Sequence, residues 1–272
     1  MIVFPNAKIN LGLHVVSKRD DGFHNIETVF YPAGWCDVLE VIKDNSSKNS
    51  EIDFTVSGNE SLSAEDNLCV RAYHLLKKDF KIPSVRGWLH KIIPVGAGLG
   101  GGSSDAAFMI KLLDKIFDLK ISTGRMKDYA LQLGSDCPFF LDSKPMFASG
   151  RGEVLEEIPE VLKNYFITIV KPSLSISTAE AYSLVKPKQT ESSLRGLISL
   201  PLRQWKDVIV NDFEIPLAEK FPEINSIKKK LYEAGAVFAL LSGSGSAVYG
   251  IFEKETDIKK IFPECVCWNG KI

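Results

Sequence analysis

A glycine-rich stretch constrains what this chain can fold into more than any other feature of its sequence. Residues 93–107, IPVGAGLGGGSSDAA, contain five glycines. The pattern of apolar residues predicts a strand at 85–93 before this stretch and a helix at 104–117 after it. Glycine permits positive φ and close approach of a ligand, and a helix start presents unpaired N–H groups and a positive dipole end. The stretch therefore indicates an anion site, most often one for phosphate.

Three common nucleotide-binding loops do not fit this stretch. The spacing of Gly96, Gly98 and Gly101 matches a dinucleotide fingerprint, but a second predicted helix, at 124–133, follows where that fold requires a strand. The stretch also lacks the Gly-Lys-Ser/Thr ending of a P-loop. A protein-kinase loop would require a lysine on the next strand and a His-Arg-Asp motif, and the sequence has neither.

The composition is that of an ordinary globular protein with one large or two modest domains. The 272 residues are 45% hydrophobic and 25% charged. A formal net charge of -1 argues against nucleic acid or an anionic membrane as a partner. The five cysteines are scattered and lack metal-ligand spacing, so we expect reduced thiols. Without a signal-peptide pattern or an apolar run long enough for a membrane, we expect a cytoplasmic protein.

Two further positions have both a structural and a functional interpretation. Residues 6–16 alternate between apolar side chains and a face with Lys8, Asn10 and Gly12, which predicts a half-buried strand. The polar face is either exposed to solvent or directed at a ligand. Asp136 follows the predicted helix at 124–133, and it is either the N-cap of a short turn containing Pro138 or a functional carboxylate.

Three segments together resemble the signatures of the GHMP small-molecule kinases. The glycine stretch, as Pro94-x-x-x-Gly98-Leu99-Gly100-Gly101-Gly102-Ser103-Ser104, resembles their phosphate-binding motif. Residues 5–11, PNAKINL, resemble their first motif, and residues 241–245, LSGSG, resemble their C-terminal motif. The three segments occur in the family's order and cover the chain from end to end.

Finer details resemble one branch of this family, which phosphorylates a diphosphocytidyl-methylerythritol in the non-mevalonate route to isoprenoid precursors. They are residues 21–24, DGFH, the triple glycine, and residues 134–140, GSDCPFF. Two alternatives remain: another GHMP kinase, such as a homoserine or mevalonate kinase, and a non-catalytic nucleotide-binding regulator with the same fold. The first fits residues 21–24 poorly, and the second would not need both Lys8 and Asp136.

The resemblance implies an α+β protein with the two-domain GHMP kinase fold. Residues 1–158 would form an ATP-binding domain similar to domain 2 of ribosomal protein S5, and residues 159–272 a ferredoxin-like domain. The charged, proline-containing segment 157–164 lies at this boundary. The resemblance also implies an active site in a cleft between the domains, and a monomer or weak homodimer.

The resemblance also implies phosphoryl transfer from ATP, with Mg²⁺, in which positioning and electrostatics dominate. Asp136 would take the proton of the attacking hydroxyl, and Lys8 would hold Asp136 and stabilise the developing alkoxide. Ser103 or Ser104 could ligate Mg²⁺, whereas the role of Asp105 stays open. The residues that would hold the triphosphate are Pro94, Val95, Gly96, Ala97, Gly98, Leu99, Gly100, Gly101, Gly102, Ser103 and Ser104.

The cytidine end of the substrate would be recognised by residues 22–24. His24 would hydrogen-bond the cytosine edge, a type of contact that discriminates strongly between bases. The aromatic residues expected to stack on the base are, in order of preference, Phe23, Tyr31 and Tyr182. The further substrate contacts implied are Asn10, Thr178 and Gly243.

Overall fold

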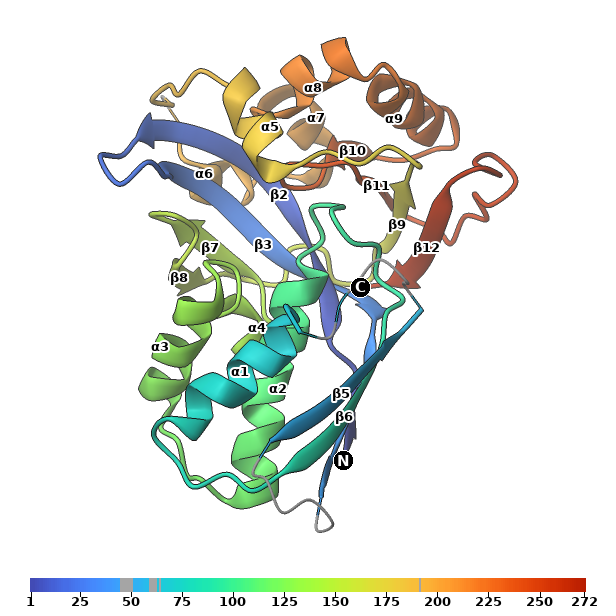
Figure 1. Ribbon diagram of the computed structural model, residues 1–272. Coiled ribbons are helices and arrows are strands. Elements are labelled where there is room, and N and C mark those ends of the chain that lie inside the picture. Colours follow the sequence, from blue (N-terminus) through green and yellow to red (C-terminus); the bar gives the residue numbers. More distant parts are fainter. Residues whose placement is uncertain (45–50, 59–62, 64, 191) are drawn as a thin grey trace. The chain divides into compact units, whose positions relative to one another are not determined.

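The computed structural model describes residues 1–44, 51–58, 63, 65–190 and 192–272 (Figure 1). The chain forms two compact units, each built from more than one segment. The first unit comprises Met1–Ala7, Trp35–Ile93 and Gly100–Ser143, and the second comprises Lys8–Gly34, Pro94–Leu99 and Lys144–Ile272. The glycine stretch is therefore divided, because residues 94–99 belong to the second unit and the residues on either side belong to the first.

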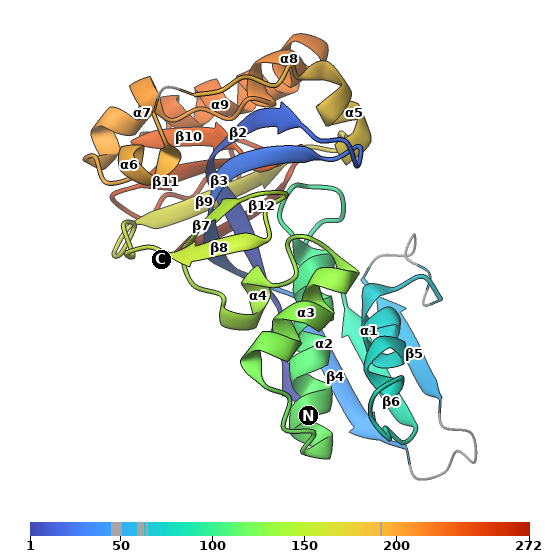
Figure 2. The same cartoon turned by 90° about the vertical axis from the view of Figure 1, so that its left-hand side faces the viewer.

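The first unit is a four-stranded sheet covered by helices. The strands lie in the order β1 (Ile2–Val3), β4 (Val38–Lys43), β6 (Val85–His90) and β5 (Ile52–Ser57); β4 and β6 are antiparallel, and β5 and β6 are parallel. The helices are α1 (Leu68–Lys77), α2 (Gly101–Phe117), α3 (Thr123–Leu133) and α4 (Phe139–Asp142). Helix α2 packs against the other three helices and β4 (Figure 2). In its predicted apolar stripe Ala107, Ile110 and Leu113 are fully buried, whereas Phe117, the last residue of the helix, is half-buried.

The second unit contains two further sheets. The first has the order β2 (Asn6–Lys18), β3 (His24–Cys36), β7 (Met146–Ser149) and β8 (Val154–Glu157), with the first two residues of β2 and the last two of β3 in the first unit. The other has the order β10 (Phe238–Leu241), β11 (Val248–Phe252), β9 (Phe166–Lys171) and β12 (Val266–Lys271), and all its pairs are antiparallel.

Short helices accompany the second of these sheets. They are α5 (Thr178–Leu184), α6 (Leu194–Leu197), the 3₁₀ helix η1 (Leu202–Gln204), α7 (Trp205–Val208), α8 (Glu214–Lys220) and α9 (Glu223–Glu233). Helix α9 packs against β10 and β11, where Ile224, Ile227 and Leu231 join the core. An antiparallel sheet with helices packed on it is consistent with the ferredoxin-like C-terminal domain expected above. None of the helices in the described ranges is long and apolar enough to cross a membrane.

Two local expectations need correction. Strand β2 is buried on both faces rather than one, because its polar side chains bond to other segments of the second unit. At Gly12, which has a φ of 85°, an added Cβ would lie 2.7 Å from Leu194 and 2.9 Å from Ile209, so side chains cover that point of the strand. Helix α2 begins at Gly101 rather than Ser104, because the last two glycines of the stretch take helical conformation after Gly100.

Candidate active site

The glycine stretch requires glycine at three alternating positions. Gly96, Gly98 and Gly100 have φ values of 64°, 75° and 71°, in the left-handed region that other residues rarely adopt. A Cβ on Gly98 would overlap the carbonyl oxygen of Ser242. The backbone of the stretch therefore runs directly against the second glycine-containing segment, residues 242–245, within the second unit.

Three consecutive carbonyl groups of the stretch accept hydrogen bonds inside the second unit. The Ala97 carbonyl accepts from the Ala247 N–H at 3.1 Å. The Gly98 carbonyl accepts from Lys8 Nζ and from Ser242 Oγ, both at 3.0 Å. The Leu99 carbonyl accepts from the Lys8 N–H at 2.9 Å. These bonds fix the stretch against β2 and the second glycine segment.

Lys8 is the centre of a buried polar network on β2. Besides the Gly98 carbonyl, its ammonium donates to Asn10 Oδ1 at 2.6 Å. Asn10 in turn donates to Thr28 Oγ1 at 2.8 Å, and Thr28 donates to the Gly12 carbonyl at 2.6 Å. The polar face of β2 is therefore not a solvent-exposed surface: it connects the strand to the glycine stretch, and a ligand at this face stays a prediction.

The second glycine segment is fixed by residues that sequence patterns did not identify. Asn211 donates from Nδ2 to the carbonyls of Leu241 and Gly243, at 2.9 and 2.8 Å. Glu214 Oε2 accepts from the Leu241 N–H at 2.8 Å. Gly243 has a φ of 54°, and an added Cβ would lie 3.2 Å from Asn10 Oδ1. The polar residues in Asn211–Glu214 show no periodicity in sequence, so only the fold reveals this role.

The start of α2 lies beside the turn that carries Asp136 in the first unit. Gly100 is the N-cap and offers no capping side chain, so the first N–H groups of the helix are not capped by it. A Cβ on Gly134 would lie 3.9 Å from Ser103 Oγ. Burial raises the pKa of the neighbouring Cys137 thiol to about 12, partly opposed by a hydrogen bond with Ser103.

Asp136 does not cap the short helix that follows it. The N-cap of α4 is Pro138, without a capping side-chain bond, and Asp136 lies in the turn at residues 135–138 before that helix. A functional role for Asp136 therefore stays a prediction. The carboxylate is half-buried in the turn after α3. Asp136 belongs to the first unit and Lys8 to the second, so their pairing stays a prediction.

His24 and Tyr182 form an aromatic pair in the second unit. Their rings are stacked, with centroids 4.7 Å apart and planes 20° from parallel. Phe23, which precedes His24 in sequence, is 52% exposed. Tyr31 is only 2% exposed, and its hydroxyl accepts from the Leu162 N–H at 3.4 Å, so we no longer retain it as a base-stacking residue. Thr178 Oγ1 lies 3.4 Å from Ser244 Oγ, beside the second glycine segment.

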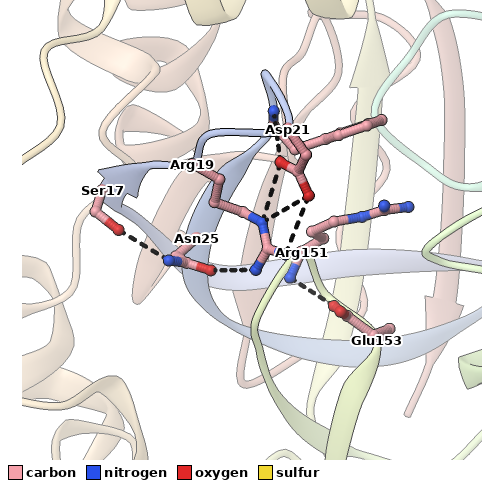
Figure 3. Close-up of polar contacts among 7 residues, drawn as sticks. Ser17, Arg19, Asp21, Asn25, Arg151 and Glu153 are labelled. Carbon is pink, nitrogen blue, oxygen red and sulfur yellow. Dashed lines mark hydrogen bonds and ion pairs between the residues drawn. The ribbon is translucent and has the colours of Figure 1, made fainter.

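The turn that carries Phe23 and His24 is held by a polar cluster (Figure 3). Arg19 donates to the Asp21 carboxylate at 3.1 and 3.2 Å and to Asn25 Oδ1 at 3.0 Å. Asn25 donates to Ser17 Oγ at 2.9 Å. The guanidinium of Arg151, from the turn between β7 and β8, lies 4.1 Å from the centre of the Phe23 ring. The turn is therefore fixed on two sides.

Known proteins match this chain along its whole length. The GHMP kinase N-terminal domain model matches residues 67–144, and the GHMP kinase C-terminal domain model matches residues 195–265. A 4-diphosphocytidyl-2-C-methyl-D-erythritol kinase from Parabacteroides distasonis is 46% identical, and one from Bacteroides thetaiotaomicron is 48% identical; each match covers 100% of both chains.

A solved structure supports the same assignment. A crystal structure of 4-(cytidine 5'-diphospho)-2C-methyl-D-erythritol kinase has a TM-score of 0.84 and 30% identity, covering 99% of this chain and 98% of that one. The α+β fold class, with GHMP kinase N- and C-terminal domains, is thereby confirmed. The chain belongs to the 4-diphosphocytidyl-2-C-methyl-D-erythritol kinase family, within the GHMP kinases.

Proposed function

We propose that this chain transfers the γ-phosphoryl group of ATP to the 2-hydroxyl of 4-diphosphocytidyl-2-C-methyl-D-erythritol, giving the 2-phosphate and ADP. The reaction belongs to the non-mevalonate route to isoprenoid precursors. The observation that carries the proposal is the bond from Lys8 Nζ to the Gly98 carbonyl, which ties a buried cation to a phosphate-type loop. The full-length similarity to relatives that bear this kinase's name supports the choice of substrate.

In this proposal the triphosphate is held by backbone N–H groups of residues 95–104, and Pro94, which has no N–H, leads into them. The first turn of α2 supplies uncapped N–H groups and a positive dipole end, which stabilise the charge that spreads over the phosphoryl oxygens. Asp136 takes the proton from the attacking hydroxyl. Lys8 holds Asp136 and stabilises the developing alkoxide.

The cytidine end is recognised by the pair formed by His24 and Tyr182, with Phe23 beside it. Aromatic rings provide stacking area, and the imidazole provides a hydrogen bond that distinguishes cytosine from uracil. Asn10, Thr178 and Gly243 remain proposed substrate contacts. Asn10 and Gly243 lie close together.

Mg²⁺ fits the serines at the start of α2 as its protein ligands. Within the described residues no group of three or more His, Cys, Asp or Glu could hold a metal. Mg²⁺ in kinases is commonly held by substrate phosphates with one or two protein oxygens, so a hydroxyl ligand is sufficient. Ser104 Oγ is buried and has no hydrogen-bond partner in the described part of the chain, whereas Ser103 is half-buried. We propose Ser103 or Ser104 as the ligand; the bound ion would neutralise phosphate charge.

We further propose a domain division at 1–158 and 159–272. The two family matches, at residues 67–144 and 195–265, fall on either side of this boundary and support it, whereas the second compact unit also includes residues 8–34, 94–99 and 144–158. The five cysteines are free thiols, which supports a reducing, cytoplasmic location. As a final part of the proposal, the chain acts as a monomer or weak homodimer.

A substrate panel tests the activity. Purified protein should consume ATP with the diphosphocytidyl substrate and place the new phosphate on the 2-hydroxyl, detected by ³¹P NMR of the product. Homoserine and mevalonate serve as competing acceptors. Equal turnover of either acceptor would make the chain a different GHMP kinase, and binding of ATP without turnover of any acceptor would favour a nucleotide-binding regulator.

A further inference from the structure

Three charged side chains are buried together in the first unit, at the two ends of the glycine stretch. Lys91 directly follows β6, Asp37 directly precedes β4, and Asp105 lies in the first two turns of α2. They are 7%, 0% and 2% exposed. The Lys91 ammonium pairs with the Asp37 carboxylate and donates to Asp105 Oδ2 at 2.7 Å. We refer to these three residues as the lysine cluster.

Asp37 also holds the backbone that leads into the glycine stretch. Its Oδ1 accepts hydrogen bonds from the N–H groups of Ile92 and Ile93, at 2.6 and 2.8 Å. Buried charges are costly unless they are paired and hydrogen-bonded, so this carboxylate strongly favours one path for the chain. The segment after β6 is therefore fixed through its backbone by Asp37 and through a side chain by Lys91.

The glycine at position 101 is explained by the same cluster. A Cβ on Gly101 would lie 3.0 Å from the Ile93 side chain and 3.2 Å from Lys91 Nζ. Both distances are tighter than ordinary van der Waals contact, so the lysine passes directly beside the first residue of α2. The close approach of Lys91 therefore explains why residue 101 is glycine, and this explanation does not require a bound ligand.

We propose that Lys91, with Asp37 and Asp105, is a set of positioning residues for the ATP phosphates. The cluster joins Ile92 and Ile93, before the stretch, to Asp105, after it. It thereby fixes the two points between which residues 94–99 run, and with them the direction of the first N–H groups of α2. Because the Asp105 carboxylate faces Lys91, it acts here as an anchor for α2 rather than as a metal ligand. This inference rests on the proposed function, since it assigns the ATP phosphates to this stretch.

Asp105→Asn is the principal test. The amide has nearly the shape of the carboxylate and leaves Lys91 and Asp37 as a balanced pair, so we expect the variant to fold. Replacing the ion pair with a neutral hydrogen bond weakens the link between Lys91 and α2, so binding of a non-hydrolysable β,γ-imido ATP analogue should weaken by about tenfold, measured by calorimetry on the full chain. The KM for ATP should rise in parallel, while the KM for the cytidyl substrate stays unchanged.

Lys91→Met provides a second test from the other side of the cluster. This change leaves two carboxylates buried without their cation, so the variant should have a markedly lower Tm. The double variant Lys91→Met/Asp105→Asn should recover part of that loss and still bind the analogue weakly. If Lys91→Met does not fold, the calorimetric titration of Asp105→Asn with the ATP analogue decides whether the inference holds.

Asp114→Asn is the matched control, because Asp114 lies near the other end of α2. Its Oδ1 accepts from the Ile121 N–H at 2.9 Å, so the change should lower the Tm without altering either KM. An unchanged analogue affinity in Asp105→Asn, or an equal loss in Asp114→Asn, overturns the inference.

The titration with the ATP analogue does not require turnover. If wild-type protein binds the analogue but phosphorylates no acceptor, the proposed function fails and the positioning role is still tested. If wild-type protein does not bind the analogue, both proposals fail.

Discussion

The imidazole of His24 lies face to face with the ring of Tyr182, although the two residues are 158 positions apart in the chain. In the proposed function, this pair is where the pyrimidine of the substrate stacks. Tyr182 also packs edge to face against Phe213, with ring centroids 4.9 Å apart, so the pair is supported from the core side. The first two predictions follow from this relationship.

We predict that Tyr182→Ala raises the KM for the cytidyl substrate by about tenfold or more, because base stacking on an aromatic side chain contributes about 1–3 kcal/mol. The KM for ATP should not change. Tyr182→Phe keeps the ring and should behave like wild type. Steady-state kinetics with each substrate varied separately provides the measurement, and an Ala variant with normal KM would remove Tyr182 from base recognition.

The pH dependence of substrate binding should follow the protonation of His24. Burial, with the nearby Lys18 ammonium, lowers the pKa of His24 below its ordinary value of 6.5. The imidazole is therefore neutral at pH 7 and gains a proton only as the pH falls further. Protonation removes its acceptor nitrogen, so we expect the KM for the cytidyl substrate to rise as the pH falls through the lowered pKa of His24.

Two variants check this assignment of the pH effect. His24→Ala should have a raised KM that lacks this pH-dependent rise. Lys18→Gln removes a neighbouring positive charge, which raises the pKa of His24, so the rise in KM should begin at a higher pH than in wild type. A pH profile that is the same in all three proteins would assign the titration to another group.

We predict that Asp136→Asn lowers kcat by several orders of magnitude while ATP still binds. The amide keeps the shape of the side chain but cannot accept the proton of the attacking hydroxyl. Asp142→Asn, at the end of α4 in the same unit, is the control. Asp142 pairs with Lys127 at 3.7 Å on an exposed surface, so its loss should leave turnover normal. Calorimetry with ATP separates loss of chemistry from loss of binding, and near-normal kcat in Asp136→Asn would rule out its role as base.

Asn211→Asp should destabilise the protein and weaken activity together. The change directs a carboxylate at the carbonyls of Leu241 and Gly243 in place of two N–H donors. A buried polar group left without its partners costs about 1–3 kcal/mol, and more when it is charged. Urea unfolding measures the loss, with Asn225→Asp on the exposed side of α9 as the control. Equal stability of the two variants would contradict the role of Asn211.

Sequence patterns predicted the parts of this fold that depend on local periodicity. Alternation identified β2, and the apolar stripe identified α2, because both signals come from one face packing against a core. The burial of Lys8 and Asn10 could not be predicted from that alternation, since the same pattern describes a solvent-exposed face. Their burial depends on the carbonyl of Gly98, which is 90 residues further along the chain.

Sequence motifs predicted some residues of the candidate site. Residues whose place depends only on tertiary contacts were missed. Lys8, Gly98 and Gly243 came from recognisable segments, and the structure brings these three together in the second unit. Asn211 is a single polar residue without a periodic context, so its bonds to the second glycine segment were not predictable. Tyr31 was chosen for its aromatic ring, but a central position in β3 places that ring in the core.

The three carbonyl bonds of the glycine stretch have a consequence for the electrical character of its surface. A peptide group is planar and trans, so its N–H points opposite to its C=O. The carbonyls of Ala97, Gly98 and Leu99 are all directed at donors of the second unit. The N–H groups of the following residues, Gly98, Leu99 and Gly100, must therefore point to the other side. Each of these N–H groups faces away from the donor that its own carbonyl contacts, so the backbone of the stretch directs donors rather than acceptors away from its contacts within the second unit.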